Sequence, residues 1–188
     1  MNNIFVFTAT GPKPKAHLEV SINHPVKHPY KTYVKDNNII DAINAVGECY
    51  CWGNTAKSFP NGRWLDMEID DYVLCYQDGK YTHFSQVIGI EHNKEFSELI
   101  WGYWEEEDKW WEYMYFLKKP QMIDIHWRNL PEIRSLYTKD GIIIGSKKHK
   151  KHKKNKKQPV GQTASTMKHF LPQVQITDQG EFHNLNVP

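Results

Sequence analysis

The stretch "DYVLCYQDGKYTHFSQVIGI", residues 71–90, carries the strongest local fold signal in the chain. Two runs rich in β-branched and aromatic residues are joined by Asp78-Gly79, a dipeptide that favours a tight hairpin turn because both positions accept positive φ. The stretch therefore predicts two antiparallel strands, and the rest of the fold is expected to assemble on them.

Further short elements flank this hairpin. Helical spacing of apolar residues predicts helices near residues 39–46 and in "KEFSELIWG", where Gly102 suits the helix end. A short helical segment is expected after residue 124. Further strands are expected at residues 3–9, 17–22, 30–34, 47–53, 110–120 and 141–145. This order predicts an α+β domain: a small mixed, mostly antiparallel β-barrel flanked by short helices.

The length of 188 residues suits one domain with tails. We expect a domain over residues 1–146, a lysine-rich linker at 147–157, and a tail or the start of a truncated region at 158–188. No stretch approaches the roughly 20 apolar residues that span a membrane. Three cysteines make a disulfide framework improbable, so a soluble cytoplasmic protein with no membrane partner is expected.

Charge is divided unevenly along the chain. Residues 1–65 hold seven basic and four acidic residues, residues 66–146 hold eight and sixteen, and "KKHKKHKKNKK" (147–157) holds eight lysines. Such a run adds salt-sensitive affinity for phosphates without sequence preference. A flexible arm along nucleic acid, a linker and a localisation signal all fit it.

Several classes of chemistry have no motif here. The chain contains no Walker-type phosphate loop, glycine-rich dinucleotide turn or serine elbow. The pairs His24/His28 and His149/His152 have no evident third metal ligand, and "EEED" (105–108) is typical of a solvated loop. We therefore expect no metal, no cofactor and no catalytic residue.

Aromatic residues distinguish the chain, at 13% of the composition with seven tryptophans. They gather in "YCWGNTAKSFPNGRW", residues 50–64, where each ring either plugs a core or stands at a pocket that stacks a flat ligand. The segment supplies rings (Trp52, Phe59, Trp64), groups that can read a base edge (Asn54, Thr55, Ser58) and phosphate contacts (Lys57, Arg63).

The motifs "CYCWG", "RWLDMEIDDYVLCYQDGKYTHFSQVIGI", "SELIWG" and "WWEYMYFLKKPQMIDI" occur in an order that resembles the EVE and YTH branch of the PUA-like superfamily. They are most similar to the amino-terminal domains of modification-dependent, McrBC-like restriction proteins, over roughly residues 45–126. Asp70 stands where those domains have a glycine. The acidic insert "GYWEEEDKWW" (102–111) is expected to lie away from DNA.

The resemblance implies recognition of double-stranded DNA carrying a modified base, with that base flipped into an aromatic cage. The base is a methylated or hydroxymethylated cytosine or 6-methyladenine, and the chain serves as the specificity domain of an antiphage restriction protein. An NTPase motor and a nuclease subunit are possible partners. Trp52 then stacks on the base, Trp64 belongs to the cage or its wall, and Trp101 is structural. Tyr33 is expected in the cage and Lys31 among the phosphate contacts.

Three other interpretations stay open. One is a YTH-like reader of modified RNA, which differs by 2′-hydroxyl contacts. Another is a nuclease or base-modifying enzyme that uses His126, His92 or the acidic clusters. The third is a protein-interaction module with exposed aromatic residues.

Overall fold

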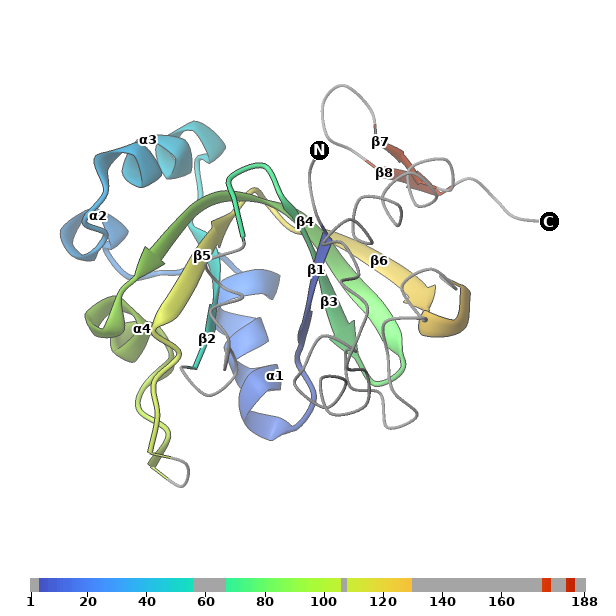
Figure 1. The fold of residues 1–188 in the computed structure, drawn as a ribbon, viewed down its shortest axis with the longest axis horizontal. Coiled ribbons are helices and arrows are strands. Elements are labelled where there is room, and N and C mark those ends of the chain that lie inside the picture. Colours follow the sequence, from blue (N-terminus) through green and yellow to red (C-terminus); the bar gives the residue numbers. More distant parts are fainter. Residues whose placement is uncertain (1–3, 56–66, 106–107, 130–173, 177–181, 185–188) are drawn as a thin grey trace, which may run out of the picture.

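A computed structural model describes residues 4–55, 67–105 and 108–129, together with two short strands, β7 (Val174–Ile176) and β8 (Phe182–Asn184), which pair with each other. The main body is an α+β fold around one six-stranded, mixed, mostly antiparallel sheet (Figure 1). The sheet order is β1-β3-β4-β5-β2, with β6 paired to β4. The expected α+β class and the mostly antiparallel sheet are confirmed.

The hairpin at residues 71–90 forms the centre of this sheet. β3 (Tyr72–Gln77) and β4 (Lys80–His92) pair antiparallel, and Asp78 and Gly79 turn between them with φ of 47° and 87°. β4 then pairs with β6 (Gln121–His126) along its first half and with β5 (Tyr113–Leu117) along its second. One long strand therefore belongs to both halves of a bent sheet.

The expected barrel is not closed, which corrects the finer part of the fold prediction. The end strands of the path are β1 (Ile4–Thr8), parallel to β3, and β2 (Tyr50–Asn54), antiparallel to β5. In Figure 1 a helical segment lies between them, consisting of α1 (Pro12–Leu18) and the π-helical turn η1 (Glu19–Asn23). Its Leu18 and Ile22 are buried, so apolar side chains fill the gap that strand pairing would close.

Two predicted strands, at residues 17–22 and 30–34, are wrong, because residues 17–22 and 30–33 are helical. Pro12 and Pro14 lie in the first turn of α1, where proline is tolerated, and the buried positions after them follow helical spacing. The short helix α2 (Tyr30–Tyr33) starts after Pro29. Their β-branched and aromatic residues raised local strand propensity, which tertiary packing overrides.

The two predicted helices are confirmed as α3 (Asn37–Val46) and α4 (Lys94–Trp101). Asp36 caps α3 by accepting from the Asn38 backbone N–H, and Asn93 caps α4 by accepting from that of Phe96. Of the region in which a helical segment was expected after residue 124, the structure describes the end of β6 and a 3-10 turn, η4 (Trp127–Asn129), and residues 130–140 lie outside the described residues. The strand expected at 141–145 lies outside the described residues.

The turn before β3 has the left-handed backbone that glycine usually supplies. Asp70 has φ of 72°, and the Asp71 N–H donates to the Glu68 carbonyl across the turn. An L-residue in this conformation carries a steric penalty that glycine lacks. Asp70 therefore adopts a backbone conformation that glycine would take without this penalty.

We expect Asp70→Gly to be more stable than Asp70→Ala by about 1 kcal/mol, because only alanine keeps the Cβ penalty at positive φ. Both variants delete the carboxylate, so its contacts cancel from the comparison. Urea unfolding of the two variants measures the difference. Equal midpoints would show that φ at residue 70 relaxes without cost.

α3 approaches the sheet closely at one glycine. A Cβ built on Gly89 would lie 2.7 Å from Cγ1 and 2.9 Å from Cγ2 of Ile39. We therefore expect Gly89→Ala to destabilise the fold by about 2 kcal/mol through overpacking. The obstacle is a side chain, so combining it with Ile39→Ala should show a favourable coupling of about 1 kcal/mol or more. Ile43→Ala, a buried isoleucine on the same helix, serves as the matched control and should be nearly additive with Gly89→Ala.

Candidate functional site

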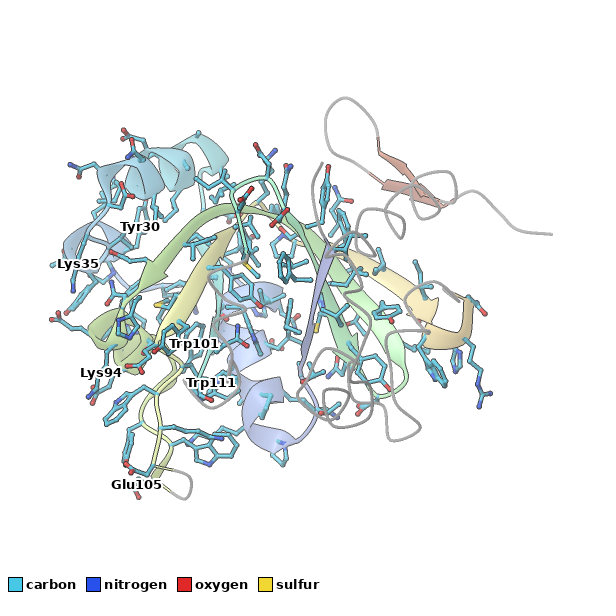
Figure 2. The ribbon with its side chains drawn as sticks, in the orientation of Figure 1. Tyr30, Lys35, Lys94, Trp101, Glu105 and Trp111 are labelled. Carbon is cyan, nitrogen blue, oxygen red and sulfur yellow. The ribbon has the colours of Figure 1, made fainter. Side chains whose placement is uncertain are left out.

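The tryptophans of three separate motifs meet in one cluster. Trp52 of β2 lies 5.8 Å from Trp111 and 6.4 Å from Trp101 between ring centroids, and Phe7 of β1 lies against it at 4.7 Å. Figure 2 shows Trp101 at the end of α4 and Trp111 next to α1. The side chain of Trp52 is 1% exposed. A base could therefore stack on Trp52 only if one of its neighbouring rings moved.

Gly53 explains how these rings come so close to β2. A Cβ at this position would lie 2.2 Å from the Trp111 carbonyl oxygen and 2.6 Å from Cζ3 of Trp101. Only glycine lets both tryptophans approach the strand at this distance. Packing therefore explains the "WG" dipeptide in this fold: the Trp52 ring lies in the cluster, and Gly53 leaves room for Trp101 and Trp111.

The two polar residues that follow Gly53 face the protein. Asn54 is half-buried and makes a hydrogen bond with Tyr115, its near neighbour across the β2–β5 pair. Burial raises the pKa of Tyr115 well above its ordinary value, and the bond with Asn54 partly opposes this. Thr55 is 1% exposed. In this conformation both predicted edge-reading groups are held at the end of β2.

Tyr33 and Lys31 lie on α2, away from Trp52. The Tyr33 ring stacks on Phe96 at 5.8 Å, and Phe96 stacks on Phe116 of β5 at 6.3 Å. Trp52 pairs with Tyr115, the strand neighbour of Phe116, and successive side chains of a strand point to opposite faces. The structure therefore places Tyr33 and Trp52 on opposite faces of the β2–β5 pair, with Lys31 exposed on the Tyr33 side.

The remaining predicted site residues lie outside the described residues. They are Lys57, Ser58, Phe59, Arg63 and Trp64. The described chain ends at Thr55, one residue after β2, and resumes at Met67.

A shallow hollow lies against the sheet and encloses no space large enough for a water molecule. It is therefore too small to hold a base, since ligand sites usually measure about 300–1,000 Å³. Its walls are mainly apolar: Phe7, Ile22, Val73, His83, Phe84, Ser85, Leu117 and Pro120.

Within the described ranges no group of three His, Cys, Asp or Glu residues could hold a metal, and no helix is long and apolar enough to cross a membrane.

The acidic insert forms a narrow hairpin in which lysines cover tryptophan rings. Trp104 and Lys109 form a β-bridge, and the Lys109 ammonium lies 4.5 Å from the Trp104 ring. Lys94 of α4 lies 3.4 Å from the ring of Trp110. Glu105, at the tip in Figure 2, is exposed. These cation–π contacts tie the insert to the body and engage the faces of its rings.

His17 is the cluster member that the sequence did not single out as a site residue. It is 4% exposed, stacks on Trp101 at 5.8 Å and meets Trp111 edge-on at 4.8 Å. A usable signal was present, since His17, Leu18, Ser21 and Ile22 follow a proline-initiated start at helical spacing. The sequence analysis predicted a strand there because "HLEVSI" has high strand propensity.

Comparison with known proteins gave no match: no protein-family model, curated protein or solved structure is detectably similar to this chain. The functional argument therefore rests on the fold, the cluster geometry and the motifs of the sequence itself.

Proposed function

We propose that this chain is a nucleic-acid-binding module that recognises a modified base in DNA. The observation that carries the proposal is the meeting of Trp52, Trp101 and Trp111 at the end of β2. These residues come from the three motifs "CYCWG", "SELIWG" and "WWEYMYFL" on which the likeness to EVE and YTH domains rests. The fold proposed is a PUA-like barrel left open between β1 and β2.

Because Trp52 is buried, we assign it a structural role and assign contact with the base to other rings. Trp52 anchors the end of β2, while Phe59 and Trp64 from the next segment supply rings that contact a flipped base. Lys57 and Arg63 would contact the flanking phosphates. This arrangement places base recognition in residues 56–66 and its support in the cluster, and it needs no bond chemistry from the chain itself.

The expected partner is double-stranded DNA carrying a methylated or hydroxymethylated cytosine or 6-methyladenine. As in modification-dependent restriction proteins, the module would deliver specificity to an NTPase motor and a nuclease held elsewhere. Its basic half, residues 1–65, includes the proposed contacts, and the lysine run at 147–157 would add affinity for phosphates that falls with salt.

The test measures binding of the whole chain, at near-physiological salt, to matched duplexes without modification or with one modified cytosine or adenine. We expect a preference of about tenfold or more, roughly 1.4 kcal/mol, for one modified duplex. Trp64→Ala should remove that preference. Trp127→Ala, at the half-buried Trp127 beyond β6, is the matched control and should keep it.

Other outcomes would favour the competing functions. Preference for a single-stranded RNA with 6-methyladenosine would indicate a YTH-like RNA reader. Cleavage of a labelled duplex on metal addition would indicate a nuclease. Equal, salt-sensitive binding to every duplex that is unchanged in Trp64→Ala would show that the affinity comes from the lysine run alone. That result would reject the proposal.

A further inference from the structure

His17 is a buried ionisable group whose ring makes no hydrogen bond. Neither Nδ1 nor Nε2 has a hydrogen-bond partner, and the side chain is 4% exposed. Its neighbours are the rings of Trp101 and Trp111, with centroids at 5.8 Å and 4.8 Å. Buried polar groups are paired in most native structures, so an unpaired imidazole at an internal contact is unusual.

This contact helps to fix α1 and η1 in the gap between β1 and β2. The Ser21 hydroxyl donates to the His17 carbonyl at 2.9 Å, and Nε1 of Trp101 donates to the Ser21 hydroxyl at 3.3 Å. Two further contacts hold α1 from outside: the Lys13 ammonium donates to the Tyr103 carbonyl at 3.3 Å, and Lys15 forms an ion pair with Asp78 at 2.6 Å that is exposed and contributes little. The helical segment is therefore held mainly by buried contacts in which His17 is central.

The charged groups around His17 do not stabilise a protonated imidazole. On its own helix, Lys13 carries the same sign as a protonated imidazole. Burial lowers the pKa of His17 to about 4, and Lys13 lowers it further, while a weak contact with the Trp101 backbone partly opposes both.

Carboxylates on the elements packed against His17 are exposed or engaged elsewhere. Glu19 of η1 pairs with His24 at 3.1 Å, and Glu98 of α4 is exposed. Glu112, which follows Trp111, pairs with His92 at 3.3 Å. Protonation of His17 would therefore place a buried cation beside Lys13, and the contact with the Trp101 backbone offsets this only in part.

We propose that His17 is an acid-sensitive latch: protonation of its imidazole releases α1 and η1 from Trp101 and Trp111 and opens the gap between β1 and β2. In the released state the imidazole reaches water and takes up a proton at its ordinary pKa. The closed state is therefore fully favoured above that ordinary value and loses stability as the pH falls toward the closed-state pKa. This inference does not depend on the proposed DNA recognition.

Amide hydrogen exchange of residues 12–23 tests the latch. After correction for intrinsic exchange rates, we expect opening of α1 and η1 to increase roughly 20-fold between pH 7 and pH 5, the ratio implied by a pKa of 6.5 open and about 4 closed. His17→Phe keeps an aromatic ring without a titrating group and should abolish the increase. His126→Gln, at an exposed histidine of β6, is the matched control and should retain it.

A second measurement keeps the inference falsifiable if His17→Phe fails to fold. Titration of the wild-type His17 imidazole by NMR should show protonation well below the ordinary value, with protection of α1 lost in the same pH range. Titration near 6.5 would overturn the latch, and so would an equal pH response of α1 in the wild type and in a folded His17→Phe or His17→Leu variant.

Discussion

Gly53→Ala is expected to destabilise the fold by at least about 3 kcal/mol, more than Gly89→Ala. The new Cβ would meet the Trp111 carbonyl oxygen at 2.2 Å and Cζ3 of Trp101 at 2.6 Å. A backbone carbonyl in a packed segment cannot move aside as the end of a side chain can. Either β2 separates from Trp111 or the cluster around Trp52 opens.

The prediction is specific because the main obstacle at Gly53 is a backbone carbonyl, whereas the obstacle at Gly89 is a side chain. Adding Trp101→Leu to Gly53→Ala frees the ring position but leaves the Trp111 carbonyl in place, so we expect little rescue. Gly89→Ala, where only Ile39 side-chain carbons interfere, should by contrast be relieved by Ile39→Ala. Urea unfolding of both pairs measures the two couplings. Strong rescue of Gly53→Ala by Trp101→Leu would show that the carbonyl contact relaxes easily.

Local sequence signals predicted the elements whose determinants are close together in the chain. The Asp78-Gly79 hairpin depends on two adjacent residues, and α4 depends on Asn93, Phe96 and Gly102 within ten positions. β6 was missed because its partner is the first half of β4, about forty residues earlier. The local sign of β6 is the alternation of apolar and polar residues in "IDIH", which is too short to distinguish a strand from a helical segment.

The site was predicted only in part, because it too depends on contacts between residues that are far apart in the chain. The resemblance to EVE and YTH domains named Trp52 as the base-stacking ring and Trp101 as a structural residue, and the structure brings both into one cluster. It could not tell that Phe7 and Trp111 pack against Trp52, because Phe7 reaches the ring from β1 across the open gap and Trp111 reaches it from the insert before β5. Tyr33 was nominated from a presumed strand, and its position in α2 takes it to the other face of the β2–β5 pair.

Trp52→Ala is expected to cost about 3–5 kcal/mol of stability, the usual range for removing a large buried aromatic side chain. The ring is 1% exposed and contacts Phe7, Trp101 and Trp111, so the cavity would lie inside the aromatic cluster. That loss is a large share of the roughly 5–15 kcal/mol typical of a domain. Urea unfolding checks it, and a loss below about 1 kcal/mol would contradict the buried position.

This expectation decides how the role of Trp52 in binding can be measured. Loss of DNA binding in Trp52→Ala would not separate base stacking from unfolding, whereas Trp52→Phe keeps a ring and should cost only about 1–2 kcal/mol. We expect folded Trp52→Phe to retain any preference for a modified duplex, since Trp52 supports the site from inside. Tyr115→Phe, which deletes the hydroxyl that bonds Asn54, is the control for disturbance at the end of β2. If Trp52→Phe loses the preference while Tyr115→Phe and the fold are preserved, Trp52 itself touches the base, and the cluster must open on binding.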